Sequence, residues 1–369
     1  MNLRTIVVDD SIVFRKAVRD SLASIAGVEV IDIAKDGLSA VEKIKRHQPD
    51  LVTLDVEMPG LNGLEVLLKL REAGIHTNVI MISSLTERGA TVTTRALENG
   101  AFDFVLKPNH NDSALNANEL RVQLSQRIAV LQKHSSDDAK PVARTPRVAA
   151  AIPQTFRPKT ANVRKPTERL EAIVLGISTG GPKALRNLIP ALPGNMSIPL
   201  LIVQHMPPIF TRSMAEDLNR ISNVNVVEAE NQMSIQPGWV YIAPGGKQMR
   251  VAGQAANRHL EITDDAAVNN CRPSVDYLFE SASRSYGPNL LAIVMTGMGN
   301  DGTDSSRTIA RNGGSVWAQD EQSCTVFGMP RRVIEANLAD EILSLDQIQT
   351  GIIRCGCQKS RLCYAGTSR

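Results

Sequence analysis

The chain has 369 residues, 43% of them hydrophobic and only 4% aromatic, which predicts two or three domains with mostly aliphatic cores. The formal net charge of +3 neither favours nor excludes nucleic acid, and five scattered cysteines are no disulfide framework and suit a reducing compartment. The first residues lack a signal-peptide pattern and no apolar stretch is long enough to span a bilayer, so we expect a soluble cytoplasmic protein.

The first third of the chain alternates short apolar runs with amphipathic segments. The runs predict strands, and apolar residues spaced three and four apart predict helices. This alternation is typical of a parallel, doubly wound α/β sheet, in which the carboxyl ends of all strands lie along one edge, where ligands bind. The predicted strands cover residues 3–8, 29–34, 50–54, 78–82 and 102–106, and the first two helices cover residues 12–24 and 38–46.

Polar side chains follow four of these strands. Three carboxylates at one edge repel each other unless a cation lies between them, and their hard oxygen atoms suit Mg²⁺. A lysine can bind a phosphoryl group and a hydroxyl can donate to it, so the set predicts an aspartyl-phosphate site. Alternatively, the aspartates merely end strands and the lysine is a solvated surface charge, but five such residues at strand ends argue against this. The five are Asp9, Asp10, Asp55, Ser83 and Lys107.

Three motifs in this region resemble those of response-regulator receiver domains, which have a flavodoxin-like fold with a parallel five-stranded sheet. They are Val8-Asp9-Asp10-Ser11, the run from Leu54 to Gly60 with the following Asn62-Gly63, and Leu106-Lys107-Pro108. The resemblance extends from residue 2 to about residue 132, and we place the receiver domain at residues 1–131.

This resemblance assigns roles to single residues. It implies that Asp55 is phosphorylated by a histidine kinase. It implies that Mg²⁺ is held by Asp9, Asp10, Asp55 and the backbone carbonyl of Glu57. The residues that respond to the phosphoryl group would be Lys107, ahead of a cis Pro108, and the switch residues Ser83 and Phe104. An aromatic residue at position 104 is almost as well explained as part of the core.

Residues 132–168 change in character. They contain five prolines, and their basic residues outnumber their acidic ones. Few apolar residues recur with any period, which predicts an extended, flexible, basic linker. Such a charge run is usually solvated, and the aromatic residues that grip bases are missing, so nucleic-acid binding is not favoured. Docking on an acidic partner or a part in domain closure stays open.

A short apolar run after the linker ends in Gly-x-Ser-x-Gly, at Gly176, Ser178 and Gly180. A strand that stops at a sharp, glycine-rich turn before a helix is the layout of a nucleophile elbow, which raises a serine above the sheet. Pro182 suits the first turn of that helix. The same turn could instead cradle a phosphate, and the motif also occurs by chance.

Two further strand ends carry the partners that a serine nucleophile needs. His205 follows the apolar run 199–203, and Asp301 follows the run 290–295. With strands also predicted at 172–175, 224–227, 239–242 and 314–317, we expect a second, mostly parallel, doubly wound α/β domain. Each partner has a structural alternative, since a lone histidine after a strand is usually structural and aspartate in a glycine-rich turn often bonds its own backbone. Convergence at one edge would make a Ser–His–Asp triad, in an order unlike that of ordinary α/β-hydrolases.

At these residues the chain resembles the chemotaxis response-regulator protein-glutamate methylesterases, which also deamidate glutamine. The resemblance covers about residues 171–343, and we place the catalytic domain at 169–350. The matching motifs are Gly176 to Gly181, Gln204 to Pro207, Tyr241 to Gly246, Cys271 to Asp276, Met295 to Gly302 and Gly328 to Pro330.

The resemblance implies an acyl-enzyme mechanism that demethylates glutamate γ-methyl esters on chemoreceptors. Ser178 would attack the ester, His205 would take its proton, and Asp301 would orient His205. The backbone N–H of Met298 would bind the oxyanion, and Thr179 would help to position His205. Arg272 is a candidate substrate contact or a structural salt-bridge residue. No cofactor is expected for the ester chemistry.

Other functions remain as alternatives. Residues 351–369 contain three cysteines without a fourth ligand at suitable spacing, so we expect a tail without regular structure rather than a metal site. The second domain could act on small esters or on other methylated proteins. It could also be a phosphorylation-controlled binding module without turnover, whereas a transcription factor is disfavoured because no helix-turn-helix is evident.

Overall fold

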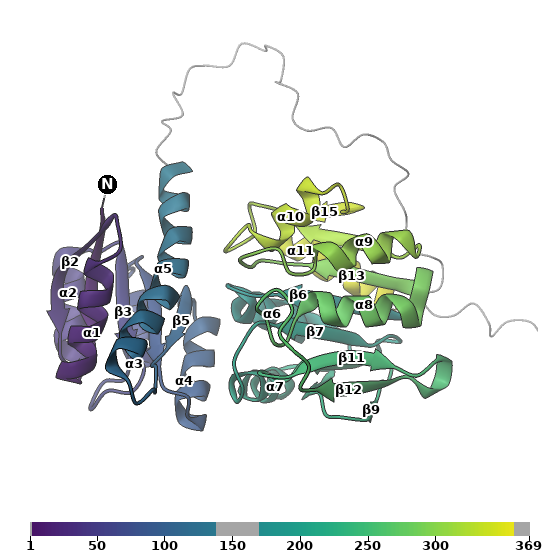
Figure 1. Cartoon of the computed structure of the whole chain (residues 1–369), viewed down its shortest axis with the longest axis horizontal. Helices are drawn as coiled ribbons and strands as arrows, with labels where there is room; N and C mark the ends of the chain where they lie inside the picture. The colour runs from purple at the N-terminus through teal and green to yellow at the C-terminus, as the bar shows by residue number, and fades with distance from the viewer. Residues whose placement is uncertain (1, 138–169, 358–369) are drawn as a thin grey trace, which may run out of the picture.

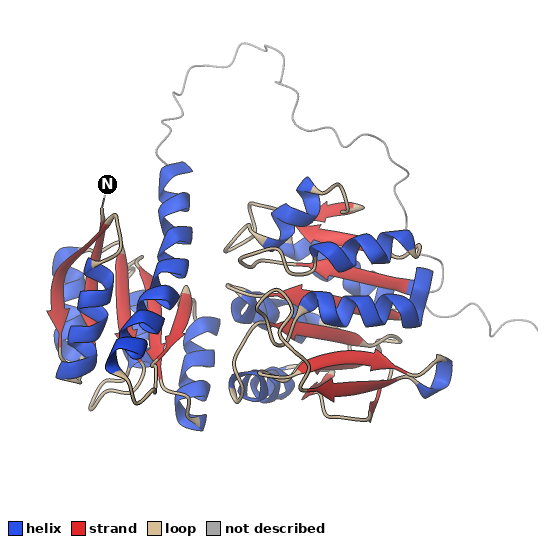
Figure 2. Cartoon of the chain, viewed as in Figure 1, coloured by secondary structure: helices blue, strands red, loops and turns tan. Residues whose placement is uncertain are grey.

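The computed structural model describes residues 2–137 and 170–357, which form two α/β domains (Figure 1). The linker predicted at 132–168 lies mostly outside these residues, as do residues 358–369 with Cys363. Helices lie on both sides of each main sheet (Figure 2). None of the described helices is long and apolar enough to cross a membrane.

The first domain is the predicted parallel five-stranded sheet, with strand order β2-β1-β3-β4-β5. Buried apolar side chains of α1 and α5 cover one face, and those of α2, α3 and α4 cover the other. The strands are β1 (Leu3–Val8), β2 (Val28–Ala34), β3 (Leu51–Asp55), β4 (Asn78–Ser83) and β5 (Asp103–Leu106). The helices are α1 (Ile12–Ala23), α2 (Gly37–His47), α3 (Gly63–Glu72), α4 (Glu87–Glu98) and α5 (Ser113–Asp137).

The second domain is built on a parallel seven-stranded sheet with strand order β15-β14-β13-β6-β7-β10-β8. Its strands alternate apolar side chains between two clusters, one with α6, α7 and α11 and the other with α8, α9 and α10. The strands are β6 (Ala172–Ile177), β7 (Leu200–Gln204), β8 (Asn225–Glu228), β10 (Trp239–Ile242), β13 (Leu290–Val294), β14 (Ser315–Gln319) and β15 (Glu341–Leu343). The helices are α6 (Gly181–Leu188), α7 (Phe210–Ile221), α8 (Val275–Tyr286), α9 (Thr303–Arg311), α10 (Met329–Glu335) and α11 (Leu345–Gly356).

Three parts of this domain differ from the prediction, and the first is the edge strand β15, which lies outside the predicted strands. A small antiparallel sheet of β9 (Met233–Ser234), β11 (Gln248–Ala252) and β12 (His259–Thr263) was not expected. The placement of a tail from residue 351 is wrong for residues 351–356, because α11 runs through them and buries Ile352 and Cys355 in the core. The domain therefore extends to the end of α11.

The two domains pack against each other through α4 of the first domain and α6 and α7 of the second (Figure 1). Glu98 at the end of α4 is buried and pairs with Arg186 of α6, with 2.6 Å between Oε2 and Nη1. Thr91 of α4 lies 3.3 Å from Ser213 of α7, between their hydroxyl oxygens. The start of β5, at Asp103 and Phe104, lies beside the catalytic candidates of the second domain.

Candidate active site and phosphorylation site

Three adjacent strands at the centre of the second sheet carry the predicted triad. Ser178 follows β6, His205 follows β7, and Asp301 lies in the loop between β13 and α9. Because β13, β6 and β7 are parallel neighbours, their carboxyl ends meet at one edge of the sheet. The chain order of the strands changes direction between β6 and β13, which is where open α/β sheets bind ligands.

The backbone around Ser178 is fixed by hydrogen bonds from both neighbouring strands. The Ser178 N–H donates to the Thr296 carbonyl at 2.9 Å, and the Gln204 side-chain amide donates to the Ser178 carbonyl at 3.0 Å. Gly180, the N-cap residue just before α6, has φ of +81°, a left-handed conformation that favours glycine. At Gly297 a Cβ atom would lie 2.7 Å from the Ser178 Cβ, so only glycine allows the β13 loop this close.

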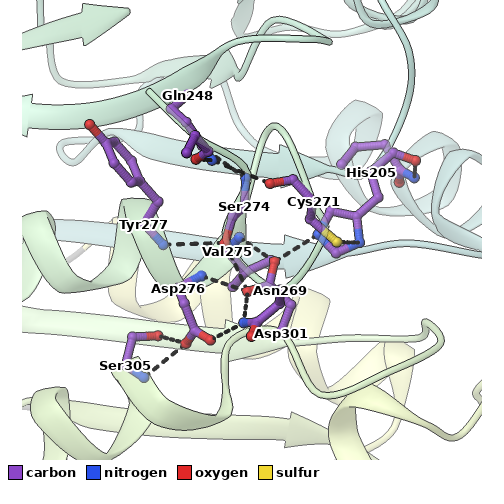
Figure 3. A network of polar contacts seen from close by, with 12 residues as sticks. His205, Gln248, Asn269, Cys271, Ser274, Val275, Asp276, Tyr277, Asp301 and Ser305 are labelled. Carbon is purple, nitrogen blue, oxygen red and sulfur yellow. Dashed lines mark hydrogen bonds and ion pairs between the residues drawn. The ribbon is translucent and has the colours of Figure 1, made fainter. Parts of the chain in front are cut away.

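Asp301 lies at the N-terminus of α8 and is the acceptor for a full set of donors (Figure 3). Its Oδ2 accepts the Val275 N–H at 2.7 Å, and its Oδ1 accepts the Asp276 N–H at 3.0 Å and the Ser274 hydroxyl at 2.9 Å. The free N–H groups and dipole of a helix N-terminus stabilise an anion. Burial opposes ionisation, but the His205 hydrogen bond and charge, with these donors, bring the pKa of Asp301 to about 2.

His205 lies between Asp301 and a cysteine. Its Nε2 is 2.9 Å from the Asp301 Oδ2, and its Nδ1 is 3.9 Å from the Cys271 Sγ (Figure 3). Burial lowers the pKa of His205, but Asp301 and Cys271 outweigh burial and raise it to about 9. Within the described residues, the Ser178 hydroxyl has no hydrogen bond to His205. The structure thus joins two members of the predicted triad, His205 and Asp301, while the hydrogen bond between Ser178 and His205 is not formed within the described residues.

Met298 was predicted to bind the oxyanion and Thr179 to help position His205. Neither Met298 nor Thr179 has a partner for its backbone N–H among the described residues, so both groups are available as donors. The Thr179 hydroxyl does not contact His205 as expected. It donates instead to the Oδ2 of Asp103, at 2.8 Å, because the first domain reaches this point of the elbow. Both side chains of this pair are buried.

An aromatic pair completes this contact between the domains. Phe104, one of the predicted switch residues, stacks on Phe210 at the start of α7, with ring centroids 4.9 Å apart and an interplanar angle of 15°. Both rings are buried. Met298 and Val326 of the second domain also pack against the cluster that contains Phe102. The start of β5 therefore covers the region of the predicted nucleophile and oxyanion site.

The predicted phosphorylation site lies at the carboxyl edge of the first sheet. Carboxylate oxygens of Asp9, Asp10 and Asp55 all lie within 4.8 Å of one another. The Lys107 Nζ lies 2.8 Å from the Asp55 Oδ2 and 3.2 Å from the Asp9 Oδ2, but the latter oxygen has no partner in hydrogen-bond geometry. Burial and the charge of Asp9 raise the pKa of Asp55 to about 6, against the opposing effect of Lys107. Such a cluster fits a hard cation.

The other residues predicted here also lie near this edge. The Glu57 side chain accepts from the Ser84 hydroxyl at 2.9 Å, and Glu57 lines a 360 Å³ cavity together with Asp10. Ser83 is buried and accepts from the Thr93 hydroxyl of α4 at 2.8 Å. The prediction of a cis peptide bond before Pro108 is wrong: among the described residues, the cis bond is the one between Arg272 and Pro273. A proline favours an extended preceding residue in either isomer, so the sequence could not separate them.

Sequence reasoning missed the polar residues that surround Asp301 and His205. Asn269 and Asp276 contact each other beside Asp301, and Cys271 contacts His205 (Figure 3). The run from Cys271 to Asp276 matched a motif of the family, but no chemical role was assigned to Cys271 or Asp276 from the sequence. Arg272 is exposed and donates to the Asp264 carbonyl at 3.4 Å, without a salt bridge in the described part of the chain.

Both domains of the chain match families of known proteins. The model of the response regulator receiver domain matches residues 5–118, and that of CheB methylesterase matches residues 173–352. The protein-glutamate methylesterase/protein-glutamine glutaminase of Desulfotalea psychrophila is 43% identical over 356 residues, which is 95% of this chain and 98% of that protein. The Thermotoga maritima protein of the same name is 40% identical over 353 residues, with the same coverage.

A solved structure is also similar to the second domain. The crystal structure of the Thermotoga maritima CheB methylesterase catalytic domain is 40% identical, covers 50% of this chain and 98% of that chain, and has a TM-score of 0.49. The full-length relatives match both domains in one chain. With its receiver domain in front of a methylesterase domain, the chain belongs to the protein-glutamate methylesterase/protein-glutamine glutaminase family.

Proposed function

We propose that this protein hydrolyses the γ-methyl esters of glutamate side chains on methyl-accepting chemotaxis receptors, releasing methanol during adaptation. The observation that carries this proposal is the placement of Ser178, His205 and Asp301 on three adjacent strands, with His205 already paired to Asp301. Family membership supports the substrate class.

The geometry suggests how the proton moves. Asp301 occupies the Nε2 of His205, so Nδ1 is the nitrogen left to take the Ser178 proton. That nitrogen now faces Cys271, and the imidazole must give up this contact and lose its proton before it can act as a base. Asp301 then stabilises the imidazolium that forms as Ser178 attacks the ester carbonyl.

The remaining steps use the same groups. The unpaired backbone N–H groups of Met298 and Thr179 would donate to the oxyanion. His205 returns the proton to the methoxide, methanol leaves, and water hydrolyses the acyl-enzyme to glutamate and free Ser178. A glutamine side chain would react in the same way with loss of ammonia, which gives the glutaminase activity in the names of the relatives.

We also propose that the receiver domain controls access to this site. A histidine kinase would phosphorylate Asp55, with Mg²⁺ held by Asp9, Asp10, Asp55 and the Glu57 carbonyl; the bound ion would neutralise charge during transfer. Lys107 and Ser83 would then contact the phosphoryl group. Ser83 would leave Thr93 of α4, and Phe104 would leave Phe210, which loosens the cover over Ser178.

The catalytic half is tested with Ser178→Ala. We expect methanol release from radiolabelled methylated receptor membranes to fall to the level without enzyme, while the thermal midpoint stays close to that of wild type. Persistent release would exclude the elbow serine as nucleophile. If the wild-type protein hydrolysed small esters but released no methanol from the receptor membranes, the alternative of another substrate would be favoured.

The regulatory half is tested by adding a small phosphodonor and Mg²⁺ to wild type and to Asp55→Ala. We expect wild-type turnover to rise severalfold or more and the variant to stay at its basal rate, because only Asp55 can accept the phosphoryl group. Equal responses of the two proteins would remove phosphorylation from the account.

A further inference from the structure

A second buried carboxyl group lies next to Asp301 and takes no part in the mechanism above. Asp276, in the first turn of α8, is 8% exposed. Its Oδ1 accepts the backbone N–H of Ser305 at 2.8 Å and the Ser305 hydroxyl at 2.5 Å, and its Oδ2 accepts the side-chain amide of Asn269 at 2.6 Å. A buried carboxylate costs free energy unless donors compensate it, so a carboxyl group at this position calls for a reason.

The side chain of Asn269 connects the two carboxylates. Its amide nitrogen donates one hydrogen to the Asp276 Oδ2 at 2.6 Å and lies 3.0 Å from the Asp301 Oδ1 (Figure 3). Both partners only accept when ionised, so the nitrogen, and not the carbonyl oxygen, of the amide faces them. Asn269 has φ of +53°, a left-handed conformation that asparagine adopts more readily than most residues.

A continuous line of hydrogen bonds therefore runs from α9 to the catalytic base. It passes from Ser305 through Asp276, Asn269 and Asp301 to His205. Asp276 fixes the direction of the Asn269 amide, and that amide holds one oxygen of Asp301. The other oxygen of Asp301 faces His205. Asn269 is itself exposed, so it covers the pair from the solvent side and is not part of the packed core.

We propose that Asn269 is a positioning residue of the triad, anchored by Asp276, which keeps the Asp301 carboxylate turned toward His205 and separates the two negative charges. The proposal rests on the triad assigned above. Asn269 also borders a cavity of 450 Å³ together with Asp276, so water can reach the network if the amide is removed. In Asn269→Ala, water can then take over part of the lost hydrogen bonding. In Asn269→Asp, a carboxylate that only accepts fills the same space, so water cannot replace the lost donor.

The test therefore uses the isosteric change Asn269→Asp, which sets a third carboxylate against the other two. We expect kcat for methanol release to fall by about tenfold to a hundredfold, the range for loss of a hydrogen bond to a charged group. KM should change by less than about twofold, because Asn269 acts through Asp301 and does not bind substrate. Asn269→Ala should lose less than Asn269→Asp.

A pH profile separates positioning from a general loss of structure. The titratable groups facing His205 are Asp301, Cys271 and, one step away, Asp276. An added carboxylate at position 269 stabilises the imidazolium further, so the rising limb of activity should move to higher pH. The matched control is Asn312→Ala, which removes an amide donor to Ser283 elsewhere in this domain and should leave kcat and the profile unchanged.

The double variant Asn269→Asp with Asp276→Asn decides between the two roles. It restores a donor and an acceptor between positions 269 and 276, but leaves a carboxylate facing Asp301. We expect the thermal midpoint to recover and kcat to stay low; recovery of both would assign Asn269 a structural role and overturn the proposal. Wild-type kcat in Asn269→Asp would also overturn it. Activity in Ser178→Ala would instead overturn the triad itself, so the two failures are distinguishable.

Discussion

Asp55 and Asp301 each lie at the carboxyl edge of a parallel sheet, and their surroundings are opposite. Asp55 in the receiver domain lies among other carboxylates, and burial with the charge of Asp9 raises its pKa to about 6. Asp301 in the methylesterase domain lies on a helix N-terminus among donors from four residues of its own domain besides His205, and its pKa is about 2.

The difference follows the chemistry proposed for each carboxylate. An aspartate that accepts a phosphoryl group needs an oxygen free to react and nearby oxygens that can bind a cation. The Asp9 Oδ2, which accepts no hydrogen bond from the described residues, is such an oxygen. An aspartate that orients a histidine must stay ionised and must not turn, so its oxygens are occupied by donors. The same position in a parallel sheet thus serves either purpose, and the local donors decide which.

The largest effect is expected from Asp301→Asn. The amide can no longer accept every donor around it, and it offers an N–H either to α8 or to His205, so we expect kcat to fall by roughly a thousandfold or more. Loss of the anion at the helix N-terminus should also cost about 1–3 kcal/mol in the free energy of unfolding.

Methanol release and thermal unfolding measure the two effects of Asp301→Asn. The exposed Asp304→Asn, a carboxylate-to-amide change in the first turn of α9, is the control that should leave methanol release unchanged and lower the free energy of unfolding by no more than about 0.3–1 kcal/mol. A variant that lost activity with unchanged stability would contradict the claim that α8 and the triad share this carboxylate.

A smaller effect is expected from Mg²⁺ on the receiver domain. At ten times its dissociation constant, the ion should stabilise the folded domain by about 1.4 kcal/mol, which corresponds to a rise of several degrees in its thermal midpoint. Asp9→Asn should abolish the rise, because Asp9 is one of the three clustered carboxylates. Calorimetry with Mg²⁺ and with a chelator measures it; an equal rise in the variant would place the ion elsewhere.

The smallest effect is expected from Cys271→Ser. Cys271 is one of the two contacts that raise the pKa of His205 to about 9, so its loss should lower the pH of half-maximal activity of the unphosphorylated protein, by about half a unit to one unit. Because the pKa of His205 is higher in the folded protein, its protonated imidazole stabilises the fold. This contribution is complete below pH 6.5 and is lost as the pH rises through about 9. Rate and unfolding profiles between pH 6 and 10 measure both, and an unshifted rate profile would contradict the contact.

The sequence was sufficient for the first sheet, for all of the second sheet except its short edge strand β15, and for the residues at the sheet edges, because apolar runs and the polar residues that end them are local patterns. Ser178, His205 and Asp301 each follow a predicted strand, and parallel pairing does the rest. The antiparallel sheet of β9, β11 and β12 was missed, since its strands are short or carry charged residues such as Arg250 and Glu261.

Contacts between distant segments were beyond local patterns. The hydrogen bond from Thr179 to Asp103 joins two domains across 76 positions of the chain, and neither residue indicates the other. Asn269 and Asp276 gain their place only because the loop before α8 folds back onto Asp301. The Cys271 contact to His205 likewise depends on tertiary structure, while the sequence shows only a lone cysteine.

Asp301 accepts hydrogen bonds from the N-terminus of α8, and this has a practical consequence for experiments that trap a substrate complex. An inactive variant must stay folded in order to bind the receptor, and a substitution at Asp301 would remove the acceptor of the N–H groups at the start of α8. Ser178 supports no such element through its hydroxyl within the described residues. Crystals or pull-downs of the stalled complex should therefore begin from a substitution at the nucleophile, with the aspartate left intact.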